Sequence, residues 1–468
     1  MKYFLDPFGC VKNQVDAENM MAHLNGAGWE STTDADLSDL IIVNTCGFIE
    51  SAKKESINAV IEWRDHYPNK KILVTGCLSQ RYAKELPELL SEADAFIGVE
   101  DPSKIVQAAN DVTAVSPNST CNSQLSFSNL TGERPLLSLP GSAYIKISDG
   151  CDNCCSYCAI PLIRGSLVSR TIPDIVEECR ALLKRGIFEL NIIGQDIGAY
   201  GADLKEEITQ RHGGTEEKQG ERSKLPELLN AISEIDGDFW VRLLYIHPDH
   251  FPLEILDIMV RDKRFIPYFD IPFQHASAKI LTAMNRNKAG QCDNSANKYL
   301  ALLENIRFRL PDAVIRSTFL IGFPGETEED FAELLDFQRK AKLDWLGCFA
   351  FSREEGTAAY AMKERIPART ANLRKLKIEE LQIQITEKNM DRFTGQNLNV
   401  LIEEQFTSEF TEDDTDNNEN LWLGRLFCHA PEIDGTAVII SSEKNLRIGT
   451  IIKCKVTARR GFDLEVRV

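Results

Sequence analysis

Three cysteines near the middle of the chain have a spacing that suits an iron–sulfur cluster. Cys151, Cys155 and Cys158 form a C-x3-C-x2-C pattern within one short segment. Three thiolates on one loop can bind three irons of a 4Fe–4S cluster, because thiolate sulfur is a preferred soft ligand for iron. The fourth iron would then stay open to a substrate. The alternatives are zinc or a group of reduced thiols, but zinc normally has four closed ligands, and the sequence after the motif has no further C-x2-C and no histidine pair with the H-x3–5-H spacing of zinc ligands.

Cys154 is a rival ligand, since its use would change the pattern to C-x2-C-x3-C. We expect Cys154 to be an unliganded thiol. The register that uses Cys151, Cys155 and Cys158 places an aromatic residue, Tyr157, directly before the last cysteine. We call Cys151, Cys155 and Cys158 the central trio.

A second group of three cysteines is spread over the first 80 residues. Cys10 follows a first strand, Cys46 ends a strand at 41–45, and Cys77 ends a strand at 72–75, with spacings of 36 and 31 residues. The carboxyl ends of parallel strands lie on one edge of a sheet, where ligands bind, so these three thiols could converge. The alternative is three buried small hydrophobic residues, which is the usual fate of free cysteine. We call these three the N-terminal trio.

The elements that must position the N-terminal trio alternate between strands and helices. Apolar runs predict strands at 40–46, 71–77 and 95–98, and helical spacing of apolar residues predicts a helix over 51–64. This alternation indicates an α/β domain over 1–112 with a parallel sheet covered on both faces. Residues 113–138 are rich in Ser, Asn and Thr and are expected to be a linker.

Residues 139–375 repeat the strand–helix alternation. About six βα units in one region predict a partial TIM-like (βα)6 barrel rather than an open two-layer sheet. Residues 203–223 are polar and are expected to form an exposed loop. The expected strands are 143–147, 188–193, 240–244, 268–271, 314–321 and 345–351, and the expected helices are 172–185, 224–234, 254–262, 292–308 and 327–341.

The last part of the chain changes character. A polar helix is expected over 369–392, so residues 376–394 form a helical linker. From 395 to 468, short strands separated by turns predict a small antiparallel β-barrel, with an acidic solvated loop at 409–419. The expected strands of this barrel are 398–402, 421–426, 436–440, 451–456 and 463–468.

Composition limits the class of protein. The 468 residues correspond to about three domains, and 43% apolar with 26% charged residues excludes a disordered chain. A net charge of −18 argues against a surface that binds nucleic acid throughout and favours a cationic partner. No secretory signal and no run of about 18 apolar residues is found, so we expect no membrane segment. Clustered cysteines, 13 in all, then indicate metal or catalytic chemistry in the cytoplasm.

The central motif resembles that of the radical S-adenosylmethionine superfamily, whose hallmark is C-x3-C-x-aromatic-C. The resemblance implies that Cys151, Cys155 and Cys158 ligate the cluster and that its open iron chelates S-adenosylmethionine. One electron from the cluster would then cleave a C–S bond of this cofactor. The cofactors carry the difficult chemistry, and the protein supplies orientation and a dry pocket.

The chain as a whole resembles the methylthiotransferases, a family within that superfamily. In this family a second 4Fe–4S domain precedes the radical domain, and a TRAM domain follows it. By resemblance, Cys10, Cys46 and Cys77 ligate the second cluster, and a second S-adenosylmethionine provides the methyl group. The matching segments are 8–13, 43–49, 75–78, 150–165, 270–276 and 322–327.

Two branches of this family differ in substrate. One modifies a tRNA adenosine, and the other methylthiolates the β-carbon of an aspartate in small-subunit ribosomal protein S-twelve. This sequence looks like the second branch, and residues 395–468 hold eight Lys/Arg against 13 Asp/Glu, which suits a basic protein better than RNA. The tRNA enzyme is the alternative, and an iron–sulfur electron carrier is a third hypothesis. The segments that favour the second branch are 43–49, 167–170, 195–196, 199–201, 269–272, 347–349 and 430–435.

The resemblance also suggests residues that contact S-adenosylmethionine. Gly322, Gly325 and Glu326 follow a strand and precede a helix, where free N–H groups favour ligands, although a capped βα turn is the alternative. The remaining candidates are Tyr157 on the adenine, Gln195 and Asp196 at a strand end, and Arg316 on the methionine carboxylate. An electron donor such as flavodoxin or ferredoxin and a sulfur donor would be further partners.

The remaining histidine and thiols have simpler interpretations. His275 could touch substrate, but it could equally be a satisfied structural histidine. Six isolated thiols are expected to be structural or surface groups, namely Cys121, Cys179, Cys292, Cys348, Cys428 and Cys454.

Overall fold

A computed structural model of the chain describes residues 1–99, 101–114, 133–204, 223–286, 295–406 and 420–468. The chain forms two compact units. Unit 1 comprises Met1–Leu137, Tyr144–Ala181 and Ser352–Ala361, and unit 2 comprises Ser138–Ala143, Leu182–Phe351 and Met362–Val468. Both cysteine trios belong to unit 1. No helix in the described ranges is both long enough and apolar enough to cross a membrane.

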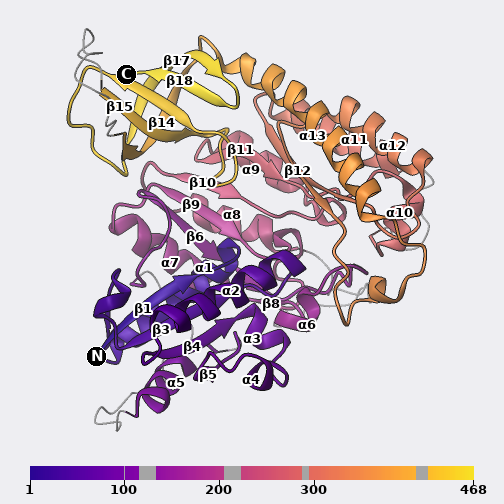
Figure 1. Cartoon of the computed structure of the whole chain (residues 1–468). Coiled ribbons are helices and arrows are strands. Elements are labelled where there is room, and N and C mark those ends of the chain that lie inside the picture. The colour runs from indigo at the N-terminus through magenta and orange to yellow at the C-terminus, as the bar shows by residue number, and fades with distance from the viewer. Residues whose placement is uncertain (100, 115–132, 205–222, 287–294, 407–419) are drawn as a thin grey trace, which may run out of the picture. The chain divides into compact units, whose positions relative to one another are not determined.

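Unit 1 contains the parallel sheet that the N-terminal sequence predicts (Figure 1). The strand order is β2-β1-β3-β4-β5, and every pairing that joins neighbours is parallel. The predicted strands at 40–46, 71–77 and 95–98 correspond to β3, β4 and β5. The strands are β1 (Lys2–Pro7), β2 (Glu30–Ser31), β3 (Leu40–Thr45), β4 (Lys71–Gly76) and β5 (Ala95–Phe96).

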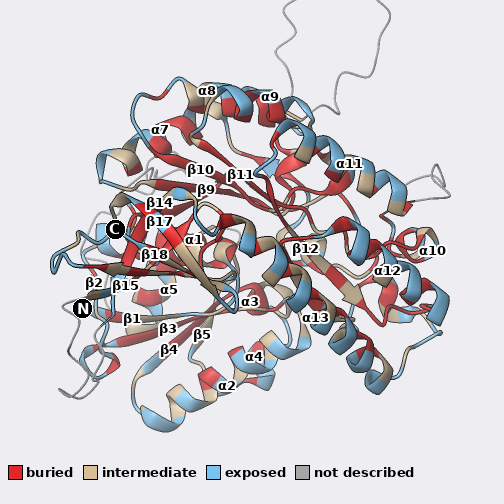
Figure 2. Ribbon diagram, turned by 90° about the horizontal axis from the view of Figure 1, so that it is seen from above, coloured by how far each residue is buried: buried red, intermediate tan, exposed pale blue. Residues whose placement is uncertain are grey.

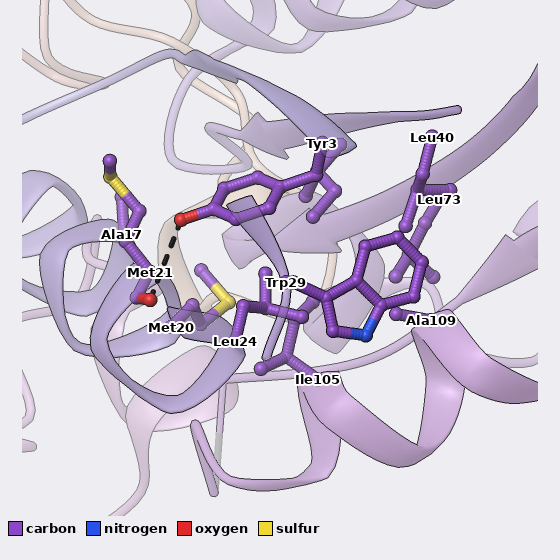
Figure 3. Packing of buried hydrophobic residues seen from close by; sticks show 11 residues of the cluster. Tyr3, Ala17, Met20, Met21, Leu24, Trp29, Leu40, Leu73, Ile105 and Ala109 are labelled. Carbon is purple, nitrogen blue, oxygen red and sulfur yellow. Dashed lines mark hydrogen bonds between the residues drawn. The ribbon is translucent and has the colours of Figure 1, made fainter. Parts of the chain in front are cut away.

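Helices cover both faces of this sheet because side chains alternate along each strand. Leu40 and Ile42 face a core that includes α1 (Val11–Gly26) and α5 (Lys104–Thr113), while Ile41 and Val43 face α2 (Glu50–His66). In the first core, Tyr3 and Trp29 pack among methionine and leucine side chains, and the Tyr3 hydroxyl donates to the Met21 carbonyl at 3.4 Å (Figure 3). Shorter elements are η1 (Ala35–Leu37), α3 (Cys77–Arg81) and α4 (Leu86–Leu89).

The segment that carries the central trio is also part of unit 1. It lies between β7 (Ser148–Asp149) and α6 (Ile160–Arg164), and β7 pairs in antiparallel fashion with β8 (Val168–Ser169). Helix α7 (Ile172–Lys184) follows and matches the predicted helix at 172–185.

The predicted partial barrel belongs mainly to unit 2, which holds β9 to β13 and the first two residues of β6. Strands β9 to β13 pair in parallel and in chain order, and β6 lies beside β9, so the strands correspond closely to the six predicted ones. Strands β6, β9 and β10 are buried throughout and β11 and β12 are mostly buried, whereas the edge strand β13 is partly exposed, as are the outer sides of the helices (Figure 2). The strands are β6 (Ser142–Lys146), β9 (Glu189–Ile193), β10 (Trp240–Leu243), β11 (Phe265–Asp270), β12 (Val314–Ile321) and β13 (Trp345–Ala350).

The helices of unit 2 include those predicted from periodicity. The predicted helix at 369–392 corresponds to α13, which packs on β13. The start of the helix predicted at 292–308 lies outside the described residues. The helices are α8 (Leu225–Ser233), α9 (Glu254–Arg261), α10 (Ala278–Ala283), α11 (Ser295–Arg309), α12 (Glu328–Ala341) and α13 (Ala368–Met390), with 3-10 turns η3 (Ile197–Ala199), η4 (Pro248–His250) and η7 (Asp391–Phe393). The 3-10 turn η6 (Ala358–Ala361) belongs to unit 1.

The C-terminal strands close into a barrel in the order β14-β15-β16-β18-β17. The prediction of an antiparallel barrel needs one correction, because β16 and β18 run parallel while the other four pairings are antiparallel. A closed ring with an odd number of strands cannot alternate direction at every step, so one parallel pair is unavoidable. The strands are β14 (Asn397–Gln405), β15 (Asn420–Leu426), β16 (Ala437–Ser441), β17 (Ile451–Arg460) and β18 (Asp463–Arg467).

Three predicted loops fall largely or wholly outside the described residues. These are most of the linker at 113–138, nearly all of the loop at 203–223, and the acidic loop at 409–419.

Candidate iron–sulfur site

The N-terminal trio lies at the carboxyl edge of the sheet in unit 1. Cys10 precedes α1 after β1, Cys46 directly follows β3, and Cys77 directly follows β4 as the first residue of α3. Strands β1, β3 and β4 are neighbours in the sheet, so their carboxyl ends bring the three turns to one place (Figure 1). Spacing alone left two arrangements open, either convergence of the three cysteines or three separate buried cysteines. The fold produces convergence.

Glycines next to the cysteines allow these turns to approach one another. A Cβ on Gly9 would lie 3.0 Å from the Cβ and 3.4 Å from the Sγ of Cys46, and a Cβ on Gly47 would lie 2.7 Å from the carbonyl oxygen of Cys77. Any side chain at these glycines would therefore push the cysteine-bearing turns apart. The pairs Gly9-Cys10, Cys46-Gly47 and Gly76-Cys77 are a sequence signal for convergence that cysteine spacing alone does not use.

The thiols of the N-terminal trio influence one another electrostatically. Burial raises the pKa of the Cys77 thiol to about 11, and the Arg164 guanidinium opposes this shift. Burial also raises the pKa of Cys46, and Cys10 adds to the shift for both thiols. The Arg164 Nη2 lies 3.3 Å from the Cys77 Sγ. The group is thus a set of three soft sulfur donors with a fixed cation beside it, which fits an iron–sulfur cluster.

The central trio lies on a loop that backbone hydrogen bonds close. The Cys151 N–H donates to the Gly165 carbonyl at 3.1 Å, which joins the two ends of the loop, and the Cys158 N–H donates to the Cys155 carbonyl at 3.0 Å. The Ile160 N–H donates to the Cys158 Sγ at 3.4 Å. All three thiols of this trio are half-buried. Three sulfur donors on one closed loop fit a cluster that has one iron open.

Cys154, the rival ligand, differs from the other three cysteines of the loop. It is exposed, and its φ of 51° places it in the left-handed region. Among the described residues, no three His, Cys, Asp or Glu side chains are close enough to share one metal ion. The ligands of an iron–sulfur cluster need not be that close to one another, because each thiolate binds an iron of its own.

The residues predicted to contact S-adenosylmethionine are divided between the units. Tyr157 is half-buried in the central loop of unit 1. Gln195 and Asp196 follow β9 in unit 2, and the Asp196 carboxylate accepts hydrogen bonds from the Gly198 and His247 N–H groups, both at 3.0 Å, and contacts His250 Nδ1 at 2.7 Å. Burial would raise the pKa of Asp196, but these partners outweigh it and lower the pKa to about 2.

Gly322 and Glu326 form a tight βα turn in unit 2 that packs against α13. The Glu326 carboxylate accepts from the Gly322 N–H at 2.7 Å and from Arg374 at 2.6 Å. A Cβ on Gly322 would lie 2.6 Å from the Cβ of Ala371, and the Gly325 N–H donates to the Glu364 carbonyl at 2.8 Å. The capped-turn alternative is present, since Thr327 caps α12 through a capping box with Asp330. The cofactor roles of these residues stay predictions.

Arg316 lies in β12, and its described ionic partners are Asp270 and Asp434, each at 3.5 Å. His275 is fully buried, and its Nδ1 accepts from the Ser277 N–H at 3.0 Å. Burial lowers the pKa of His275 to about 3, as expected for a structural histidine. Of the six isolated thiols, Cys121 and Cys292 lie outside the described residues, and the other four are buried.

Sequence reasoning missed the charged residues around the two trios. Arg164 stands in the motif after Cys158 but carries no metal-ligand signature of its own. Arg81 donates to the Gly47 carbonyl at 2.9 Å and to Glu354 at 2.7 Å, and Lys53 contacts the same carboxylate at 3.0 Å. These contacts join residues far apart in sequence, so only the fold reveals them.

Three family descriptions match consecutive parts of the chain. The Uncharacterized protein family UPF0004 matches residues 2–98, the Radical SAM superfamily matches residues 145–337, and the TRAM domain matches residues 394–468. Together with the partial barrel and the two cysteine trios, these matches define a radical S-adenosylmethionine enzyme with a TRAM domain.

Curated relatives match over almost the entire length. Proteins from Treponema denticola and Clostridium kluyveri, each named ribosomal protein uS12 methylthiotransferase RimO, are 44% and 39% identical to this chain. The alignments cover 98% and 99% of this chain, and 99% and 97% of the relatives. The chain belongs to the RimO family of radical S-adenosylmethionine methylthiotransferases, which confirms the predicted family.

A solved structure supports the fold. The radical S-adenosylmethionine methyltransferase TsrM from Kitasatospora setae, determined with cobalamin and a 4Fe–4S cluster, has a TM-score of 0.53 at 14% identity. The match covers 76% of this chain and 73% of that chain. At this identity the likeness concerns the fold alone.

Proposed function

We propose that this enzyme methylthiolates the β-carbon of an aspartate in ribosomal protein uS12, the small-subunit protein S-twelve. One observation carries the proposal: a chain that aligns end to end with RimO proteins places two separate trios of thiols in one compact unit. Two trios provide ligands for two 4Fe–4S clusters, and methylthiolation needs both radical generation and a sulfur site. The second candidate, the tRNA enzyme, is not favoured by these relatives.

The two trios have different roles in this proposal. Cys151, Cys155 and Cys158 would hold a cluster with one open iron for S-adenosylmethionine, and the hydrogen bond from Cys151 to Gly165 keeps that loop closed. Cys10, Cys46 and Cys77 would hold the second cluster. When bound, these cofactors supply the radical chemistry and the sulfur, which no side-chain base could replace, because the hydrogen to be removed is unactivated.

The residues assigned to S-adenosylmethionine remain part of this proposal. Tyr157 is positioned by the loop that carries Cys155 and Cys158, and Asp196 is a buried carboxylate that stays ionised at neutral pH. The other assigned residues are Gln195, Arg316, Gly322, Gly325 and Glu326.

The domain limits proposed from sequence are residues 1–112 for the second-cluster domain, 139–375 for the radical domain and 395–468 for the TRAM domain. Residues 113–138 and 376–394 would be the connecting segments. The proposed setting is the cytoplasm, with a flavodoxin or ferredoxin as electron donor and a separate sulfur donor.

Charge supports a protein substrate. The TRAM region carries eight basic and 13 acidic residues, so a basic ribosomal protein would be attracted to it and a polyphosphate backbone would be repelled. An RNA-binding barrel would need a basic surface, because phosphate contacts dominate affinity for nucleic acid.

The decisive experiment reconstitutes both clusters anaerobically and offers two substrates in parallel. One reaction contains a uS12 peptide with the candidate aspartate, and the other contains tRNA from a strain that lacks the tRNA methylthiotransferase. We expect the peptide alone to gain the mass of a methylthio group in place of one hydrogen. Modification of tRNA without modification of the peptide would contradict the proposal.

A further inference from the structure

Arg164 connects the loop of the central trio to the N-terminal trio. It is the last residue of α6, six positions after Cys158, and its side chain is 2% exposed. Its Nη1 contacts the Asp149 carboxylate at 3.0 and 3.2 Å, and its Nη2 contacts Asp16 Oδ2 at 2.8 Å. The same Nη2 lies 3.3 Å from the Cys77 Sγ. One buried guanidinium therefore touches a thiol of the other trio.

The contact with Cys77 is not needed to balance the buried charges. Lys146 faces the same two carboxylates, with its Nζ 2.8 Å from Asp149 and in contact with Asp16. Two cations and two carboxylates already compensate one another, which the three buried members, Arg164, Lys146 and Asp16, require. The Cys77 thiol is an additional partner of Arg164. The described contacts of Lys146 do not include it.

The planar guanidinium suits this arrangement better than an ammonium group would. Its N–H donors lie in a fixed fork, so it can hold two carboxylates and still direct a donor at a sulfur. Asp16 lies on α1 and Asp149 lies at the end of β7, so the carboxylates fix the side chain from both directions. Apolar contacts add to this, because Cys77 packs with Ala159 and with Ile163, which directly precedes Arg164 in α6.

We propose that Arg164 is a positioning residue that donates a hydrogen bond to the Cys77 sulfur and raises the reduction potential of the cluster held by the N-terminal trio. This inference rests on the proposed assignment of Cys10, Cys46 and Cys77 to a cluster. Reduction adds negative charge to a cluster, so a fixed positive charge and a hydrogen bond to a ligand sulfur favour the reduced state.

The test isolates the N-terminal cluster in the full-length chain. Substitution of all three central cysteines by Ala leaves one cluster per chain, whose reduction can be followed by electron paramagnetic resonance against solution potential. In this background Arg164→Gln is compared with Lys146→Gln, which removes one positive charge from the same pair of carboxylates but leaves the thiol contact in place. Each variant leaves one cation for the two carboxylates, so iron content per chain is measured to show whether each still folds and holds the cluster.

We expect Arg164→Gln to lower the ratio of reduced to oxidised cluster at a fixed potential by about tenfold, equivalent to about 59 mV for a one-electron couple. Lys146→Gln should change the ratio by less than about threefold (roughly half of that shift). Arg164→Lys keeps the charge and should restore most of the wild-type ratio. If Arg164→Gln does not hold iron, Arg164→Lys provides the test. Lysine lacks the forked N–H donors of the guanidinium, so the hydrogen bond to the Cys77 sulfur should be lost. The Fe–S stretching band of the Cys77 ligand should then move to higher frequency.

The outcomes separate this inference from the proposed function. Equal shifts for Arg164→Gln and Lys146→Gln, or no shift for Arg164→Gln, would overturn the role of Arg164 while leaving the cluster assignment standing. An unchanged Fe–S band in Arg164→Lys would overturn it in the same way. A chain with all three central cysteines replaced that binds no iron would instead overturn the assignment of the N-terminal trio, and the inference would fail with it.

Discussion

The central and N-terminal trios both lie in unit 1, but they are held in different ways. The central trio occupies one loop of eight residues. This loop is closed by a hydrogen bond within it, from Cys158 to Cys155, and by one from Cys151 to Gly165, directly after α6. The N-terminal trio comes from three turns that are 36 and 31 residues apart and that meet only because β1, β3 and β4 are neighbours. The first depends on local backbone geometry and the second on the packing of a sheet.

This difference predicts which changes harm which trio. A substitution that disturbs the sheet edge should displace Cys10, Cys46 or Cys77 while the closed loop keeps its own shape. A substitution confined to the loop should do the reverse. Only contacts that join the two trios, such as that of Arg164 with Cys77, should affect both.

The largest expected effect comes from removing one cysteine of each trio. Cys155→Ala should reduce cleavage of S-adenosylmethionine to background, because the central cluster loses a ligand. Cys46→Ala should retain cleavage and lose methylthiolation. Assays for 5′-deoxyadenosine and for the modified peptide measure the two steps separately.

The matched control for this pair is Cys154→Ala. Cys154 is exposed and lies directly before Cys155, and the proposed assignment leaves it without iron, so both activities should persist. Methylthiolated peptide from the Cys46→Ala enzyme would show that the two trios do not have separate roles.

A smaller but clear effect should follow from a methyl group at the sheet edge. Gly76 and Gly165 both have a backbone conformation that glycine alone adopts easily, with φ/ψ of 99°/−165° and 71°/−159°. A Cβ on Gly76 would lie 2.6 Å from the Thr45 nitrogen, whereas a Cβ on Gly165 would meet nothing within 4 Å. Gly165→Ala should cost about 2 kcal/mol of unfolding free energy from strain, and Gly76→Ala about 4 kcal/mol.

Denaturant unfolding of the two glycine variants, together with iron content per chain, would measure this difference. Gly76→Ala should lose iron at the N-terminal trio. Equal costs for the two variants would mean that crowding against β3 does not position Cys77.

A third, smaller effect concerns the stability contributed by the ion pairs next to the turns that carry the N-terminal trio. Arg81, in the helix that begins at Cys77, holds the Gly47 carbonyl and the buried Glu354, whose side chain is 2% exposed. Arg81→Met leaves Glu354 with Lys53 as its remaining cation and should cost about 3 kcal/mol.

Lys54→Met is the control for Arg81→Met. Lys54 is 71% exposed and pairs with the exposed Glu50 at 3.7 Å, so its removal should change unfolding free energy by less than about 0.5 kcal/mol. Thermal unfolding of both variants tests this, and a similar loss in each would refute the special role of the buried pair.

The smallest effect is on pH dependence. Burial would raise the pKa of Glu354, but hydrogen bonds from Ser352, Lys53 and Arg81 outweigh it and lower the pKa from its unfolded value of 4.5. The resulting stability is therefore present above pH 4.5 and is lost as pH falls through the lower pKa of the folded state. The stability difference between wild type and Glu354→Gln should shrink from pH 6 to pH 3 in urea unfolding. A constant difference would contradict this.

Much of the fold follows from the sequence because strands and helices leave local patterns. The buried strands β3 and β4 are short apolar runs, and all six strands of the partial barrel lie close to their predicted positions. The small barrel is also predicted, but its single parallel pair depends on how five strands close, which no local pattern records. Helix α1 went unpredicted, because polar residues are scattered through its buried face.

The candidate site shows the same division between what a local sequence pattern records and what tertiary packing decides. The spacing of Cys151, Cys155 and Cys158 is fixed by covalent connection within one loop, so the sequence alone determined that these thiols lie together. Tertiary structure decided the convergence of Cys10, Cys46 and Cys77 and the contact of Arg164 with a sulfur 87 residues earlier in the chain. The physical reason is that strand neighbours and buried ion pairs are chosen by packing and charge compensation over the whole unit, and these forces act on residues that the sequence lists far apart.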